Sequence, residues 1–386
     1  MVRYAFYVCI LACTGIYFYY WLRRAAEAFG FWPAHQSVRQ ILVLLAALFV
    51  FPAVNIWGIW AVVVFHLLAF ALCMDGVHSI WKCSRKDKGG VSGKRFEWLW
   101  ASGLMPAAAV AVLLIYGWWN MHHVVRTSYT VYTDKPIRKE GYRIAFFSDL
   151  HYGTTMNAEA LQSVCLQIEM ERPDLLVLGG DLVDEHTSRA EMEEVFEALS
   201  QVTTRYGIYY IYGNHDRNAY AKNPNYTAKE LAAEIEAAGI TILRENAVEI
   251  EKELFLVGRD DRTNPDAAGR VSGAALVNGV NQNEYLVLLE HQPRNLKENS
   301  TLGFDLQLSG HTHGGQIAPV GWLYRLTGFG EWNYGLTSID SLTVIVTSGM
   351  GGLNYPIRTG KHSEYVIVDV IPTAQSLSWQ VHPSAH

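Results

Sequence analysis

Three long apolar runs in the first third of the chain constrain its fold more than any other feature. Tyr4 to Leu22 is about one bilayer long, Ile41 to Met74 is too long for one span, and Leu99 to Trp119 follows a polar stretch. Pro52 and Asn55 near the middle of the second run predict a tight helical hairpin. We therefore expect a transmembrane region over residues 1–121 with four helices, at about 4–22, 40–54, 56–74 and 99–119.

The first apolar run has a second interpretation, which is a cleaved signal peptide. Ala26-Glu27-Ala28 would then supply the small residues of a processing site. However, Arg23 and Arg24 directly follow the run, and Tyr, Phe and Trp dominate it. This pattern favours a retained membrane anchor, which is the interpretation that we adopt.

Charge divides the chain near residue 125. Residues 1–125 carry ten Lys/Arg and four Asp/Glu, so 21 basic and 33 acidic residues remain in 126–386, a net charge of −12. This acidic part argues against a nucleic-acid partner. The segment 75–97 is basic, and the positive-inside rule places it in the cytoplasm. We therefore expect a multi-pass protein of the cell membrane, whose domain after residue 120 is extracytoplasmic.

The rest of the chain alternates apolar runs typical of buried strands with segments of helical spacing. The strands expected first are 142–147, 174–178 and 207–212, and the helices between and after them are 158–171, 187–200 and 228–238. After residue 248 strands predominate, which favours a second sheet packed on the first. The sequence thus predicts an α/β domain over residues 122–386.

Polar side chains follow five of the predicted strands, at the edge where open α/β sheets bind ligands. One cluster, residues 309–316, places two histidines at i and i+2 among glycines, which allow close approach of the backbone to a ligand. Imidazole, carboxylate and amide groups together suit Mn²⁺, Fe²⁺ or Zn²⁺, and there are too many for one ion. One such histidine is usually structural, but five clusters predict metal binding. The candidates are Asp149, His151, Asp181, Asn214, His215, Asp216, His291, His311 and His313.

These clusters form five ordered blocks: Asp149-Leu150-His151, Gly180-Asp181, Gly213-Asn214-His215-Asp216, His291 and Gly310-His311-Thr312-His313. The pattern resembles the calcineurin-like metallophosphoesterase family over about residues 142–370. The continuation Gly314-Gly315-Gln316 is similar to a membrane-attached subgroup of that family. The resemblance implies a four-layer αββα fold, with two packed mixed sheets flanked by helices, and hydrolysis of phosphoester bonds.

The resemblance also implies a ligand set for two divalent ions that share Asp181. The first ion would be held by Asp149, His151, Asp181 and His313. The second would be held by Asp181, Asn214, His291 and His311. Mn²⁺ is the metal that we expect, with Fe²⁺ or Zn²⁺ as alternatives.

His215 does not match a ligand position of the family. The resemblance implies that it protonates or stabilises the leaving oxygen, while Asp216 either orients its ring or caps a turn. In the purple acid phosphatase branch a tyrosine ligand stands three residues after the shared aspartate. This chain has Asp184 there, so we expect no tyrosinate–iron site.

The substrate that we expect is a phosphorylated lipid or small phosphoester, cleaved at a phosphoester or pyrophosphate bond by water that the metals activate. Tethering beside a lipid bilayer raises the effective concentration of lipid or lipid-linked headgroups. One alternative is a UDP-diacylglucosamine-type pyrophosphatase of lipid A synthesis, although its cytoplasmic substrate disagrees with an external domain. Another is a sensor or scaffold with a non-catalytic metal site.

Two further clusters leave alternatives open. The apolar and aromatic residues after the histidine pair form either a lid that dips toward lipid or ordinary packing of the second sheet. They are Trp322, Tyr324, Leu326, Phe329, Trp332 and Tyr334. Asp260, Asp261 and Arg262 follow a predicted strand, and either reach a phosphate or headgroup or form a solvated turn.

Overall fold

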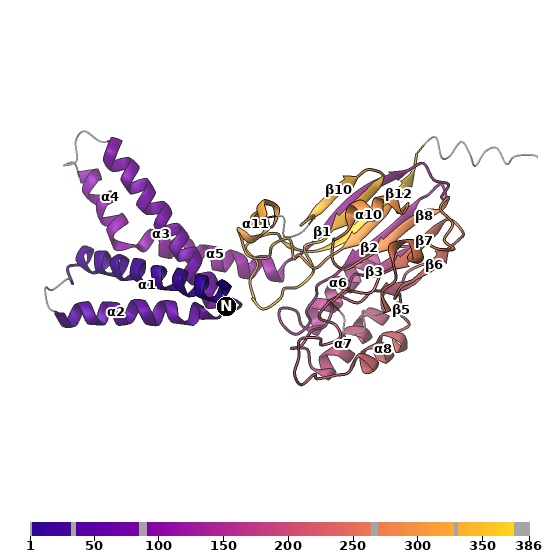
Figure 1. Cartoon of the computed structure of the whole chain (residues 1–386), viewed down its shortest axis with the longest axis horizontal. Helices are drawn as coiled ribbons and strands as arrows, with labels where there is room; N and C mark the ends of the chain where they lie inside the picture. The colour runs from indigo at the N-terminus through magenta and orange to yellow at the C-terminus, as the bar shows by residue number, and fades with distance from the viewer. Residues whose placement is uncertain (1, 32–35, 85–90, 264–268, 328–330, 374–386) are drawn as a thin grey trace, which may run out of the picture. The chain divides into compact units, whose positions relative to one another are not determined.

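The structure is a computed structural model that describes residues 2–31, 36–84, 91–263, 269–327 and 331–373 (Figure 1). The chain forms two compact units, residues 1–117 and residues 118–386. The first unit is helical, and the second contains both sheets. Each unit is described separately below.

The first unit is built from apolar helices. They are α1 (Val2–Ala28), α2 (Gln36–Val50), the short 3-10 helix η1 (Phe51–Val54), α3 (Ile59–Ser84), α4 (Val91–Ser102) and α5 (Leu104–His122), which continues into the second unit. Within the described residues, four segments are long and apolar enough to cross a membrane: Ala5–Ala28, Gln36–Val54, Ile59–Ser84 and Leu104–His122. The four apolar helices of the predicted fold are therefore present.

The helix ends differ from the predicted ones at two places. The expected span 99–119 is divided at Gly103, whose φ of +70° ends α4 and allows α5 to begin at Leu104. The start of the expected 75–97 segment continues α3 to Ser84, and Asp75 within it accepts hydrogen bonds of 2.7 Å from Tyr17 on α1 and Trp100 on α4. Residues 85–90 of this basic segment lie outside the described residues.

The first sheet of the second unit has the strand order β1-β12-β2-β3-β4-β5. Strands β2 to β5 are parallel, β12 is antiparallel to β2, and β1 is parallel to β12. The sheet is therefore mixed. Its strands are β1 (Val124–Thr133), β2 (Tyr142–Phe147), β3 (Leu175–Leu178), β4 (Ile208–Tyr210), β5 (Thr241–Ile242) and β12 (Ser363–Pro372).

The second sheet has the order β10-β11-β9-β8-β7-β6 and is also mixed. Strands β7, β8, β9 and β11 are parallel, whereas β6 and β10 run antiparallel at the two edges. Its strands are β6 (Asn246–Ile250), β7 (Leu254–Gly258), β8 (Tyr285–Leu289), β9 (Leu306–Ser309), β10 (Gly335–Ile339) and β11 (Leu342–Val346).

Side-chain alternation along the strands produces four layers. Phe146 of β2 and Val177 of β3 lie in an apolar core with residues of the second sheet, such as Val287. Their neighbours, such as Phe147, face a second core formed with α6 (Ala158–Met170), α7 (Arg189–Ser200) and α8 (Ala228–Ala237). The outer face of the second sheet packs against α9 (Gly273–Leu276) and α10 (Leu296–Thr301). The predicted αββα fold is confirmed (Figure 1).

Candidate metal centre

The predicted ligands lie in loops that follow the carboxyl ends of β2, β3, β4, β8 and β9. The packing of the two sheets brings these ends together. Among the described residues, two groups could each hold a metal ion. Within each group, the ligand atoms lie within 4.8 Å of one another. We call them group A, which is Asp149, His151 and His313, and group B, which is Asp181, His291 and His311.

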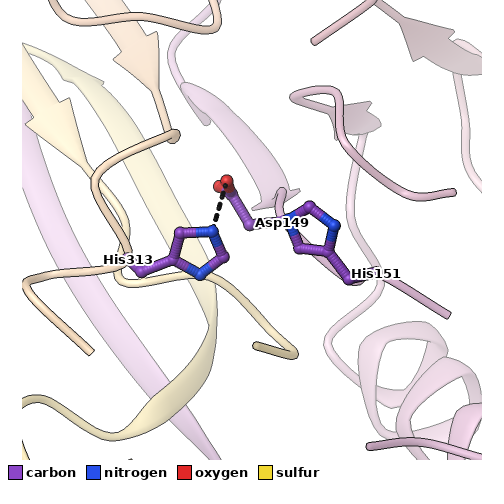
Figure 2. Close-up of side chains that lie close together, drawn as sticks. All are labelled: Asp149, His151 and His313. Atoms are coloured by element: carbon purple, nitrogen blue, oxygen red, sulfur yellow. Dashed lines mark ion pairs between the residues drawn. The ribbon is translucent and has the colours of Figure 1, made fainter. Parts of the chain in front are cut away.

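Group A joins the loops after β2 and β9, and all three of its side chains are buried. His313 Nε2 lies 3.4 Å from Asp149 Oδ1 (Figure 2). The rings of His151 and His313 stack with their centroids 5.2 Å apart. The Asp149 carboxylate also accepts hydrogen bonds from the Ser148 hydroxyl and, at 2.9 Å, from the His311 backbone N–H.

Group B centres on Asp181, in the loop after β3. Asp181 Oδ2 lies 3.0 Å from His291 Nε2, and Asp181 Oδ1 accepts a 2.7 Å hydrogen bond from the His215 backbone N–H. His311 Nδ1 lies 2.8 Å from Asn214 Oδ1, so the structure brings Asn214 to this group as well. The loops after β2 and β3 are themselves joined, because the His151 N–H donates to the Asp181 carbonyl at 3.1 Å.

The backbone holds several of these residues in a conformation that is rare outside glycine. Five of the predicted ligands have a positive φ, between +44° and +70°: Asp149, His151, Asp181, His311 and His313. Such conformations cost on the order of 1–3 kcal/mol each and persist at functional sites, where surrounding contacts fix them. Gly213 and Gly310 permit the close approach of the loops. A Cβ at Gly213 would lie 2.1 Å from Asp181 Oδ1, and one at Gly310 would lie 2.0 Å from Ser148 Oγ.

Neighbouring oxygens orient two of the imidazole rings. His151 Nδ1 lies 3.0 Å from Asp184 Oδ2, and His291 Nδ1 lies 2.7 Å from the Gly179 carbonyl. Both Nε2 atoms are buried; that of His151 has no hydrogen-bond partner among the described residues, and that of His291 faces Asp181 Oδ2 at 3.0 Å. Buried polar atoms without a partner are rare, and an imidazole held through one nitrogen is suited to bind a metal through the other. The residues present therefore fit divalent metal ions.

The pKa values of four ligands agree with a metal centre, whereas the pKa of His291, which burial alone would lower, is raised well above its ordinary value by the negative charge of Asp181. Burial lowers the pKa of His313 to about 3 and that of His311 to about 4, so both rings are in the neutral form that metals require. Burial alone would raise the pKa of Asp149 and Asp181, but nearby imidazoles, mainly His313 and His291 respectively, lower both below the ordinary value. The two aspartates thus keep their negative charge.

The orientation of His215 differs from the prediction. Its Nδ1 lies 2.8 Å from Glu185 Oε2, so Glu185 holds the ring and the expectation that Asp216 orients it is wrong. Burial would lower the pKa of His215, but Glu185 and Asp181 together raise it to about 9. Glu185 has no counterpart among the five sequence blocks.

Asp216 instead organises the loop that carries Asp181. Its carboxylate accepts hydrogen bonds from the backbone N–H groups of Asp181 at 2.8 Å and Gly213 at 2.6 Å, and from the Tyr210 hydroxyl at 2.6 Å. This is the turn-capping role given above as the alternative. Burial, with repulsion by Asp181, raises the pKa of Asp216 to about 6.

Arg358, which sequence reasoning did not place in the site, supports the histidine loop. Its guanidinium is fully buried and donates to the His313 carbonyl at 2.9 Å and to the Gly351 carbonyl. Asp184 and Glu185 were likewise not predicted as partners. No residue spacing signals these contacts, because they depend on how the loops pack.

The two aspartates of the cluster at residues 260–262 have structural partners. Asp260 is buried and pairs with Arg217 and Arg244, and Asp261 accepts hydrogen bonds from the Gln292 side chain. Neither aspartate therefore lies in a solvated turn.

Of the apolar and aromatic residues after His313, some pack against the second unit and others are exposed. Trp332 packs against the core beneath the second sheet, and the Tyr334 hydroxyl donates to Glu364 at 3.2 Å. In contrast, Trp322 and Leu326 on α11 (Val320–Thr327) are 77% and 81% exposed. Phe329 lies outside the described residues.

Comparison with known proteins identifies relatives. Residues 142–315 match the family model of the calcineurin-like phosphoesterases. An uncharacterized metallophosphoesterase of Aquifex aeolicus is 31% identical over 265 residues, which cover 68% of this chain and 97% of that protein. A transmembrane protein with metallophosphoesterase domain from Danio rerio is 28% identical, with 80% and 70% covered. Phosphodiesterase YaeI of Escherichia coli is 27% identical, with 60% and 82% covered.

Proposed function

We propose a lipid-directed activity from one premise: this chain belongs to the calcineurin-like phosphoesterase family, and it is a metal-dependent phosphoric ester hydrolase. Its candidate membrane helices and its transmembrane relative indicate a membrane location. The proposed reaction is hydrolysis of a phosphoester or pyrophosphate bond in a lipid or lipid-linked headgroup. The observation that carries the proposal is the convergence of the two ligand groups, together with Asn214, from five loops.

Two divalent cations would be held by the two groups, with Asp181 shared between them. Group A with Asp181 would hold the first ion, and group B with Asn214 would hold the second. When bound, such ions lower the pKa of water to near neutrality and neutralise charge on the phosphoryl oxygens. The mixture of imidazole, carboxylate and amide ligands supports Mn²⁺, with Fe²⁺ or Zn²⁺ as alternatives.

His215 is proposed as the group that holds a proton for the leaving oxygen. Glu185 fixes the ring through Nδ1, which leaves Nε2 as the proton donor. The raised pKa of His215 supports a protonated ring at neutral pH. This arrangement argues for catalysis over a purely structural metal site, because a scaffold needs no oriented acid beside its metals.

The proposed location is the cell membrane, with the hydrolase domain outside the cytoplasm. The charge bias of the 75–97 segment supports this side. A cytoplasmic reporter inserted in that segment and an export-dependent reporter fused to the C-terminus should both be active. Activity of a cytoplasmic reporter at the C-terminus would reverse the assignment.

The test of activity is hydrolysis of a chromogenic phosphodiester by the full chain in detergent, with Mn²⁺ added. Asp181→Asn should abolish it, whereas Asp340→Asn should not. The two aspartates are matched in backbone, with φ of +54° and +51°, but the Asp340 side chain is exposed and pairs with Lys297, which belongs to neither ligand group. Equal turnover of the two variants would refute the proposed centre.

The preference for a lipid substrate is tested in a second assay. The same preparations are given phosphatidic acid or a diacyl pyrophosphate lipid in mixed micelles, and the release of phosphate is measured. The proposal expects a higher kcat/KM for the lipid than for a soluble ester with the same phosphate group. A preference for the soluble ester would refute the lipid substrate but not the hydrolase activity.

A further inference from the structure

Helix α11 exposes an apolar surface that the second unit does not cover. Four of its residues are more than a third exposed: Val320, Trp322, Leu323 and Leu326. The two most exposed, Trp322 and Leu326, stand four residues apart and so lie on one face of the helix. A large apolar patch of this kind on a soluble surface indicates a contact with another molecule or with lipid.

The end of α5 is hydrogen-bonded to a loop of the second unit, residues 358–361. Asn120 in the last turn of α5 donates from Nδ2 to the carbonyls of Arg358, at 2.9 Å, and Lys361, at 3.2 Å. The Ser363 hydroxyl donates to the Met121 carbonyl at 2.9 Å. The loop 358–361 is thereby fixed to the end of a helix whose length and composition suit a membrane span.

The same loop is hydrogen-bonded to the segment that leads into α11. The N–H groups of Thr359 and Gly360 donate to the Gln316 carbonyl at 3.0 and 2.9 Å. The Ala318 N–H donates to the Thr359 hydroxyl at 3.0 Å. Two successive sets of hydrogen bonds therefore connect the end of α5 to the start of α11, and both sets lie within the second unit.

We propose that α11 is a membrane-contact helix, which places Trp322 and Leu326 in the interface of the bilayer that α5 crosses. The end of α5 has the composition of such an interface, since Trp118 and Trp119 are 58% and 52% exposed there. A short helix with one apolar face is suited to lie in this region. The occupant of the exposed face is thus the lipid bilayer.

A pocket beside α11 gives the membrane contact a use. A pocket of about 490 Å³ lies between α11 and residues 359–361, and Gly314, which follows His313, lines it. Lys361 also lines this pocket and offers a positive charge to an anionic headgroup. If the proposed function holds, this pocket would receive the headgroup of a lipid phosphoester while its acyl chains stay in the bilayer. The membrane contact itself does not depend on turnover.

The test measures lipid contact directly. In the full chain, the native cysteines are replaced by serine or alanine, Leu326→Cys is labelled with a polarity-sensitive fluorophore, and the protein is reconstituted in phosphatidylcholine–phosphatidylglycerol nanodiscs with or without doxyl-labelled lipid. The five cysteines to replace are Cys9, Cys13, Cys73, Cys83 and Cys165. Tyr132→Cys is the matched control. Tyr132 is 69% exposed and stands eight residues along β1 from Val124, which is about 26 Å from the end of α5 at ~3.3 Å per residue.

The expected result is a blue-shifted probe at position 326 that doxyl lipid quenches several times more strongly than the probe at position 132. Trp322→Cys repeats the measurement if the first variant does not fold. A probe at either α11 position that reports water, or one that is shielded but not quenched, would overturn the proposal, since it would mean exposure to solvent or packing on protein. Hydrolysis plays no part in the measurement, so its outcome is separate from that of the proposed function.

Discussion

Group A and group B hold similar ligands but fix them by different means. In group A, the His151 ring is held by a side chain, the carboxylate of Asp184, whereas in group B the His291 ring is held by the backbone carbonyl of Gly179. Both arrangements leave Nε2 directed at the candidate metal site, where His291 Nε2 faces Asp181 Oδ2 at 3.0 Å. The difference teaches that the orientation of group A depends on a residue that mutation can remove, whereas that of group B follows from the fold of the loop after β3.

Substitution of the shared aspartate, Asp181, should have the largest effect and should distinguish the two groups most clearly. Asp181→Asn should remove both ions, whereas Asp149→Asn should remove the group A ion alone, because only Asp181 is expected to serve both. The turnover rate of Asp181→Asn should fall by on the order of 10⁶-fold or more, because most of the rate acceleration of the enzyme is lost with the metal ions. Metal content per chain by elemental analysis, with the wild-type chain as reference, checks the difference. Equal losses in the two variants would contradict the shared role.

The next effect concerns the proton donor, whose partner Glu185 is adjacent to Asp184 in sequence. His215→Ala should lower turnover by roughly 10²- to 10⁴-fold for esters with poor leaving groups, and much less for 4-nitrophenyl esters, whose leaving oxygen needs no proton. Steady-state kinetics with phenyl and 4-nitrophenyl phosphodiesters measure both. His186→Ala, at an exposed position, is the control. A uniform loss across leaving groups would assign His215 a structural role.

Substitution of Asp184, whose carboxylate holds the His151 ring, should make the affinities for the two ions differ. Asp184→Asn should weaken the group A ion by about 10- to 100-fold, as is usual for partners of metal ligands, and leave the group B ion in place. A chelator titration, followed by metal content and turnover, should change from one step to two. If both ions leave together as in the wild type, then Asp184 has no special connection with group A.

The smallest effect expected is on stability. Asp216→Asn places an amide against backbone N–H groups that now donate to a carboxylate, so some donors lose their acceptor. The free energy of unfolding should fall by about 1–3 kcal/mol. Denaturant unfolding of the full chain in detergent, followed by the second unit's signal, measures it. An unchanged midpoint would mean that the loop after β3 does not depend on this carboxylate.

The residue types of the metal centre could be predicted because metal ions accept few kinds of ligand. Asp149 and His313 stand at strand ends in a recognisable order, and parallel strands bring their ends to one edge. Their partners could not be predicted, because a carboxylate that holds an imidazole can come from any loop that packs nearby. Glu185 and Arg358 reach the site only through tertiary contacts.

The fold was predictable to a similar degree. Hydropathy located the four apolar helices, and the alternation of strands with helices, followed by a strand-rich half, indicated two sheets. The helix ends were less accessible to prediction, because they depend on single contacts. Gly103 divides α4 from α5 through its backbone conformation, and Asp75, inside the longer α3, binds side chains of two other helices.

The hydrogen bonds of Asn120 have a mechanical consequence. Asn120 binds the carbonyl of Arg358, and the guanidinium of Arg358 binds the carbonyl of His313. One residue, Arg358, thus links the last turn of α5 to a ligand of group A. A helix that crosses bilayers of different thickness changes its tilt to match them. A change at the last turn of α5 would therefore reach the backbone of a metal ligand through one buried side chain.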